Sequence, residues 1–261
     1  MSVQDAPVEI APLPAPKTPR TWKFIGTSLW GLFAFAALFL GQVTVVLYLI
    51  VIKDAPFDRT LITSTLSSGT AIAMSVIMGL PAVGAALWLA TRLSRMAFAD
   101  YLALNRTSWK NYAIGALGLI LLVGVWELIS RAMGRDSTPG FMLEVLKSSR
   151  SDGTLWLLII AFCVAAPVTE EFLVRGFLYR GWSESFLRTW GAIALSSLVW
   201  TAMHAQYYDP FLFSQVFSMG LLFGYLRYRT GSTWLTIYLH ALNNLAATVQ
   251  TLLIANGVMS P

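Results

Sequence analysis

Long apolar runs without a charged residue dominate this chain. Seven stretches lack Asp, Glu, Lys and Arg: 26–52, 60–91, 111–126, 153–169, 189–208, 210–226 and 230–261. A helix needs about 20 apolar residues to cross the hydrocarbon core of a bilayer, and several stretches reach that length. We therefore predict an all-α, polytopic transmembrane helix bundle of about seven to eight spans. Seven of them are placed at 27–52, 69–91, 112–130, 154–174, 190–207, 211–227 and 232–255.

Two segments modify this pattern. Apolar residues continue beyond 169 at Phe172 and Phe177, which predicts one long helix that ends near Trp182. In segment 131–153, apolar and charged positions are interleaved, as is typical of an amphipathic helix at a membrane surface.

Composition and charge agree with a membrane protein. Apolar residues make up 56% of the chain and charged residues 12%, about half the share usual in soluble domains. The net charge of +5 comes from bases between the apolar runs, so it indicates topology rather than nucleic-acid binding. Twelve of the eighteen Lys and Arg fall on the side of the N-terminus, which predicts that the N-terminus is cytoplasmic. The short loops and small size favour a prokaryotic inner membrane.

We divide the chain into three parts. Residues 1–21 contain five prolines and no apolar core, which predicts a disordered cytoplasmic arm. Residues 22–150 form N-terminal transmembrane helices and the surface segment. Residues 151–261 form a helical core that carries the candidate chemistry.

Polar residues within the apolar runs are the candidates for that chemistry. The only two histidines, His204 and His240, lie in such runs, as does the pair Glu170-Glu171. Acids and imidazoles are costly inside a bilayer and usually face a polar cavity with a function. With a helical rise of 1.5 Å per residue, Glu170, His204, His240 and Asn244 lie about 14 to 21 Å from the predicted cytoplasmic helix ends. Side chains from three helices therefore share one layer.

This layer is compatible with more than one chemistry. A glutamate takes a proton from water, and a histidine orients that water. A second histidine and an amide donate hydrogen bonds to a developing oxyanion. Alternatively, Glu170, His204 and His240 hold a divalent metal such as zinc, although the His-Glu-x-x-His motif is absent. Glu171 and Arg175 are four residues apart, so we expect an ion pair that fixes the helix.

Three motifs resemble those of the CAAX protease and bacteriocin-processing (CPBP, or Abi) family of intramembrane proteases. Glu170-Glu171-Phe172-Leu173-Val174-Arg175 is similar to its Glu-Glu-x-x-x-Arg motif. Trp200-Thr201-Ala202-Met203-His204 is similar to Phe-x-x-x-His, with Trp200 where the family favours Phe. His240-Ala241-Leu242-Asn243-Asn244 is similar to His-x-x-x-Asn.

The resemblance covers about residues 155–250 and implies an intramembrane endopeptidase, of either the metallo or the glutamate type. It implies that Glu170 and His204 activate water, that His240 and Asn244 bind the oxyanion, and that Glu171 and Arg175 support them. The expected partners are the lipid bilayer and a membrane-associated protein or peptide substrate; prenylated CAAX proteins are not assumed.

Other interpretations remain open. One alternative is a non-catalytic membrane scaffold or bacteriocin-immunity protein of the same fold. A second is a proton-coupled transporter with a protonatable site at the membrane midplane. Gly220 and Gly224 form a Gly-x-x-x-Gly step typical of close helix packing. Glu127, late in the third span, either lines the cavity or reaches the membrane interface, and we favour the interface.

Overall fold

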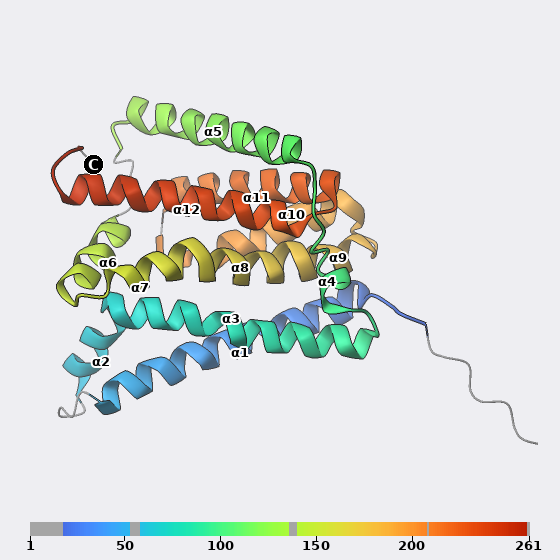
Figure 1. The fold of residues 1–261 in the computed structure, drawn as a ribbon, viewed down its shortest axis with the longest axis horizontal. Coiled ribbons are helices and arrows are strands. Elements are labelled where there is room, and N and C mark those ends of the chain that lie inside the picture. Colours follow the sequence, from blue (N-terminus) through green and yellow to red (C-terminus); the bar gives the residue numbers. More distant parts are fainter. Residues whose placement is uncertain (1–17, 53–57, 136–139, 208, 260–261) are drawn as a thin grey trace, which may run out of the picture.

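The computed structural model describes residues 18–52, 58–135, 140–207 and 209–259. Within these residues all regular structure is helical, and the long helices lie side by side in a bundle (Figure 1). The N-terminal helices are α1 (Lys23–Ile52), α2 (Arg59–Leu66), α3 (Gly69–Ser94), α4 (Phe98–Tyr101), α5 (Trp109–Ala132) and α6 (Gly140–Ser151). Most of the predicted proline-rich arm lies outside the described residues.

Four helices in the described part of the chain are long and apolar enough to cross a membrane. They are α1, α3, α5 and the continuous helix Leu155–Ser183. Large apolar side chains are exposed along α1 and α5, as expected for surfaces that face lipid. The chain is an integral membrane protein, as predicted.

The predicted number of seven to eight spans is not confirmed. The last three helices are present at the predicted places: α10 (Arg188–Ala202), α11 (Pro210–Thr230) and α12 (Thr233–Ala255). However, α10 has only 15 residues, and polar side chains lower the hydropathy of α11 and α12. The predicted span 190–207 is too long because Pro210 begins α11 with Asp209 as its N-cap, so the chain must leave α10 earlier.

The helix Leu155–Ser183 is one helix, as predicted, with two π-helical segments. It consists of α7 (Leu155–Ile160), a π segment (Ala161–Ala165), α8 (Ala166–Glu171), a second π segment (Phe172–Leu178) and α9 (Tyr179–Ser183). Pro167 has no N–H to donate to the carbonyl of Cys163, and the first π segment ends just before this position. Such π segments occur often at functional sites. Here they flank Glu170 and Glu171.

Small residues and a tight turn place the last three helices. A methyl group on Gly220 would come within 2.9 Å of Ser197 Cβ, and one on Gly224 within 2.9 Å of Ile193 Cγ2. The Gly-x-x-x-Gly step therefore packs α11 closely against α10, as predicted. Gly231 ends α11 with a φ of +65°, which favours glycine, and Ser232 caps the start of α12. This two-residue turn places α12 beside α11.

The helix that carries Glu170 lies between two groups of helices. In Figure 1, α8 lies between the pair α1 and α3 and the group α10 to α12. The main core joins both groups through buried side chains: Leu87, Leu173, Phe177, Trp200, Phe223 and Leu239. In segment 131–153, α6 buries Val145 and Leu146 against α3, so its predicted amphipathic helix is present from Gly140 onwards.

Candidate active site

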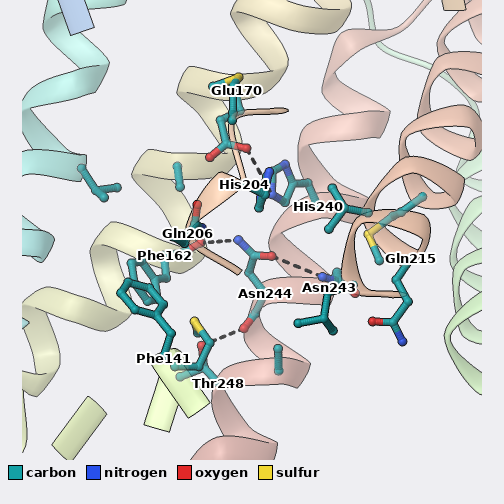
Figure 2. Close-up of a pocket in the computed structure, with 18 of the residues that line it drawn as sticks. Phe141, Phe162, Glu170, His204, Gln206, Gln215, His240, Asn243, Asn244 and Thr248 are labelled. Atoms are coloured by element: carbon teal, nitrogen blue, oxygen red, sulfur yellow. Dashed lines mark hydrogen bonds and ion pairs between the residues drawn. The ribbon is translucent and has the colours of Figure 1, made fainter. Parts of the chain in front are cut away.

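The four predicted catalytic side chains line one pocket of about 630 Å³. The described helices α1, α3, α5, α6, α8, α11 and α12 and the end of α10 contribute to its wall. Figure 2 shows Glu170 and the two histidines close together, with the amides of α12 farther along the pocket. The side chains that the structure brings together here are Glu170, His204, His240 and Asn244.

A fully buried ion pair supports the pocket from behind. Arg175 Nη1 donates to Glu171 Oε1 at 3.0 Å, and both side chains have no solvent exposure. The predicted pair is therefore present, and it has two further contacts. Arg175 Nη2 donates to the carbonyl of Gly220 at 3.2 Å, and His240 Nδ1 donates to Glu171 Oε1 at 3.1 Å. Glu171 thus holds the ring of His240 through Nδ1.

Because Nδ1 of His240 is bonded to Glu171, the other ring nitrogen, Nε2, faces the carboxylate of Glu170. His240 Nε2 lies 3.9 Å from Glu170 Oε2. The Glu170 side chain keeps 19% exposure, whereas the imidazole keeps 3%. Glu170 is therefore the accessible carboxylate of the pair, and Glu171 is the buried one.

Trp200 joins these groups. Its indole Nε1 donates to Glu170 Oε2 at 2.6 Å. Its ring meets the rings of His204 and His240 edge-on, with centroids 5.1 and 5.3 Å apart, and the guanidinium of Arg175 lies 4.4 Å from its centre. From the sequence, Trp200 was noted only as an aromatic residue where the family favours Phe. Its hydrogen bond to Glu170 was not predicted.

His204 lies just beyond the end of α10, whose last residue is Ala202. The predicted span 190–207 had placed it inside a helix. Its Nδ1 donates to the backbone carbonyl of Trp200 at 2.9 Å. A neutral imidazole that donates through Nδ1 presents the lone pair of Nε2 on the opposite side of the ring. The ring also lines the pocket with Glu170.

Asn244 is held by the first π segment. The N–H of Ala166 bonds to the carbonyl of Ala161, and Pro167 has no N–H, so the carbonyl of Phe162 lacks its helical donors. Asn244 Nδ2 donates to this carbonyl at 2.9 Å (Figure 2). An amide nitrogen carries two hydrogens, so a second hydrogen remains for a substrate oxygen. The π segment therefore orients a donor of the pocket.

The region that carries these side chains is similar to a known protein family. Residues 152–246 match a family model described as "Type II CAAX prenyl endopeptidase Rce1-like". The predicted family resemblance is confirmed over the region that contains all three motifs.

One curated relative extends the similarity. An Escherichia coli protein, described as "Uncharacterized 24.3 kDa protein", is 28% identical over 130 residues. The aligned part covers 49% of this chain and 58% of the relative, so little more than half of that protein is matched. No solved structure matches the chain significantly.

The predicted metal ligands of the Rce1-like segment have suitable chemistry but not the required arrangement. Metal-binding histidines usually donate their second N–H to a carboxylate or carbonyl, as His240 and His204 do here. However, within the described ranges no three His, Cys, Asp or Glu side chains form a group that could hold a metal ion. The metal site therefore stays a prediction, and the mechanism proposed below routes no step through it.

Several pocket residues were missed by the sequence interpretation. Thr248 continues the face of His240 and Asn244 at the same spacing of four, so it could have been found. Gln215 comes from α11 and carried no signal. Glu127 also lines the pocket, while it pairs with Arg131 at 2.8 Å. Of the two positions considered for Glu127, the structure thus shows the one at the pocket wall.

Proposed function

We propose that this protein is an intramembrane endopeptidase of the CAAX protease type. Its substrate is a membrane-associated protein or peptide, and its nucleophile is a water molecule activated by Glu170 and His204. One observation carries the proposal. The accessible carboxylate, both histidines of the chain and an amide donor line one pocket in the Rce1-like segment of a membrane protein.

The first step is attack by water. Glu170 accepts a proton from water while His204, through Nε2, orients that water by a hydrogen bond. The oxygen forms a bond to the carbonyl carbon of the scissile peptide, and the carbonyl electrons move onto its oxygen. In the second step the protonated Glu170 gives its proton to the leaving nitrogen. The C–N bond then breaks, which releases a new carboxyl end and a new amino end.

The oxyanion side consists of Asn244 and of His240 in its doubly protonated form, in which Nδ1–H bonds to Glu171 and Nε2–H is the donor for the oxyanion. Donors fixed in advance stabilise the developing negative charge and often supply the largest catalytic contribution. Asn244 is fixed by Phe162, and His240 is fixed by Glu171. Both are therefore held in place before a substrate enters.

The pocket wall indicates the chemistry of the substrate. Apolar side chains of α1, α3 and α5 lie opposite the amides and hydroxyls of α11 and α12. The described lining contains the carboxylates Glu127 and Glu170 but no Lys or Arg. We infer that the pocket takes an apolar peptide segment with neutral or basic side chains beside the cleaved bond. An acidic segment would meet these two carboxylates and would find no Lys or Arg side chain in the described lining to pair with.

We also propose the membrane arrangement. The protein lies in a prokaryotic inner membrane. Its N-terminus is cytoplasmic, because Lys and Arg are more frequent on the N-terminal side of the predicted topology. The helices α10 to α12 complete the bundle around the pocket, and α12 exposes Leu245 and Val249 as a lipid-facing helix would.

Purified protein in liposomes tests the function. Wild type and Glu170→Ala are incubated with a library of apolar peptides, and the products are identified by mass spectrometry. The proposal predicts cleavage by wild type and a loss of at least a thousandfold in Glu170→Ala. Equal cleavage by both proteins would refute it. Proton flux through the liposomes without cleavage would favour a transporter instead.

A further inference from the structure

One residue outside the proposed catalytic set contacts three of its members. The indole N–H of Trp200 donates to Glu170, its carbonyl accepts from His204, and its ring edge packs on His240. The side chain is 2% exposed. Its orientation is fixed from behind by Arg175, whose guanidinium lies over the ring. A phenylalanine at this position would keep the ring contacts and the carbonyl but would lack the N–H.

We propose that Trp200 is a positioning residue that holds Glu170 aimed into the pocket through its indole N–H. The kinetic consequences of this role rest on the proposed hydrolysis. The hydrogen bond between Trp200 and Glu170 is independent of the proposed function.

The charge of the acceptor makes this hydrogen bond important. A hydrogen bond to a carboxylate is shorter and stronger than one between neutral groups, and 2.6 Å is short for an N–H donor. The bond restricts Oε2, so that Oε1 is the oxygen left to face a water molecule. General-base catalysis needs the base within hydrogen-bond reach of that water and in a fixed orientation.

Other ionisable groups face Glu170 as well. His240 approaches from α12 and His204 from the end of α10, while Arg175 lies one turn farther along the same helix. Glu127 lines the pocket from α5. All of these groups remain in a Trp200→Phe variant. A difference between Trp200→Phe and wild type therefore reports the N–H group.

The kinetic test measures kcat and KM of peptide cleavage for wild type, Trp200→Phe and Trp182→Phe. Trp182 is a matched control because it is also buried and its indole donates to a serine hydroxyl at 3.1 Å, away from the pocket. Loss of the Trp200 N–H frees the Glu170 carboxylate to turn away from the attacking water, which lowers the rate of the chemical step.

In Trp200→Phe, kcat falls about tenfold with KM little changed, because the substrate does not touch the indole N–H. In Trp182→Phe both kcat and KM stay near the wild-type values. An unchanged kcat in Trp200→Phe would overturn the proposal. An equal fall of kcat in Trp182→Phe would also overturn it, because general loosening of the core would then be the cause.

A spectroscopic test needs no activity. The indole N–H signal of Trp200 is assigned in ¹⁵N-tryptophan-labelled protein by its absence from Trp200→Phe. It should lie downfield, as a strongly bonded N–H does, and move upfield in Glu170→Gln. An unchanged signal in Glu170→Gln would refute the hydrogen bond, even if Trp200→Phe failed to fold. If the signal moves but no peptide is cleaved, the proposed function fails and the contact between Trp200 and Glu170 survives.

Discussion

The buried pair behind the pocket permits the sharpest stability prediction. Glu171 and Arg175 have no solvent exposure, and Glu171 Oε1 accepts from both Arg175 and His240. Removal of one partner from a buried ion pair costs about 3–5 kcal/mol, because the other charge stays buried without compensation. Glu171→Gln keeps an acceptor oxygen. We therefore expect it to lower the free energy of unfolding by about 3 kcal/mol, at the lower end of this range.

The assay is unfolding of the purified protein in detergent, with Glu184→Gln as the control. Glu184 also pairs with an arginine four residues away, Arg180, but its side chain is 47% exposed. Exposed pairs contribute about 0–1 kcal/mol, so this control should unfold almost like wild type. Equal losses of stability in Glu171→Gln and Glu184→Gln would refute the reasoning.

A double variant separates stability from activity. Glu171→Leu with Arg175→Met replaces both charges by apolar groups, which is often neutral or stabilising for a buried pair. We expect most of the stability to return. Cleavage should remain low, because His240 has lost the carboxylate that holds its Nδ1. Full recovery of cleavage would show that Glu171 serves the fold alone.

Three further predictions concern packing, metal and substrate. Gly220→Ala should lower the free energy of unfolding by about 1–3 kcal/mol, because the added methyl group overpacks against Ser197. In the control Gly84→Ala the methyl group meets nothing within 4 Å, so the change should be neutral or slightly stabilising. Equal melting temperatures of the two variants would contradict this prediction. If the predicted metal site forms, elemental analysis should find stoichiometric zinc that is lost in His204→Ala together with activity; cleavage by metal-free protein after treatment with 1,10-phenanthroline would contradict this prediction. A peptide with Lys beside the cleaved bond should be cut at least tenfold faster than its Glu counterpart, and Glu127→Gln should reduce the difference; a preference for Glu would refute the inferred pocket chemistry.

Much of the helix layout could be predicted from the sequence, because charge-free runs are a direct consequence of the bilayer. The long helix through Glu170 was predicted because apolar residues continue beyond the two glutamates, and the contact at Gly220 and Gly224 was predicted from their spacing. The number of spans could not be fixed in the same way. Polar residues that build a site also lower the hydropathy of the helices that carry them, as in α11 and α12.

The members of the site could be predicted from motif and spacing, but their contacts could not. That Glu171 holds His240 depends on the packing of α12 against α8. The bond from Trp200 to Glu170 depends on a rotamer that spacing does not determine. The orientation of Asn244 depends on a π segment at Pro167, and the sequence pattern indicated only a continuous helix there.

The central claim is that Glu170 activates water to hydrolyse a peptide bond within the bilayer bundle. Cleavage in H₂¹⁸O by wild type and Glu170→Gln in liposomes tests it most directly. The account predicts one ¹⁸O atom in each new carboxyl end for wild type, and no product for Glu170→Gln while its melting temperature stays near that of wild type. Undiminished cleavage by a folded Glu170→Gln protein would contradict the account.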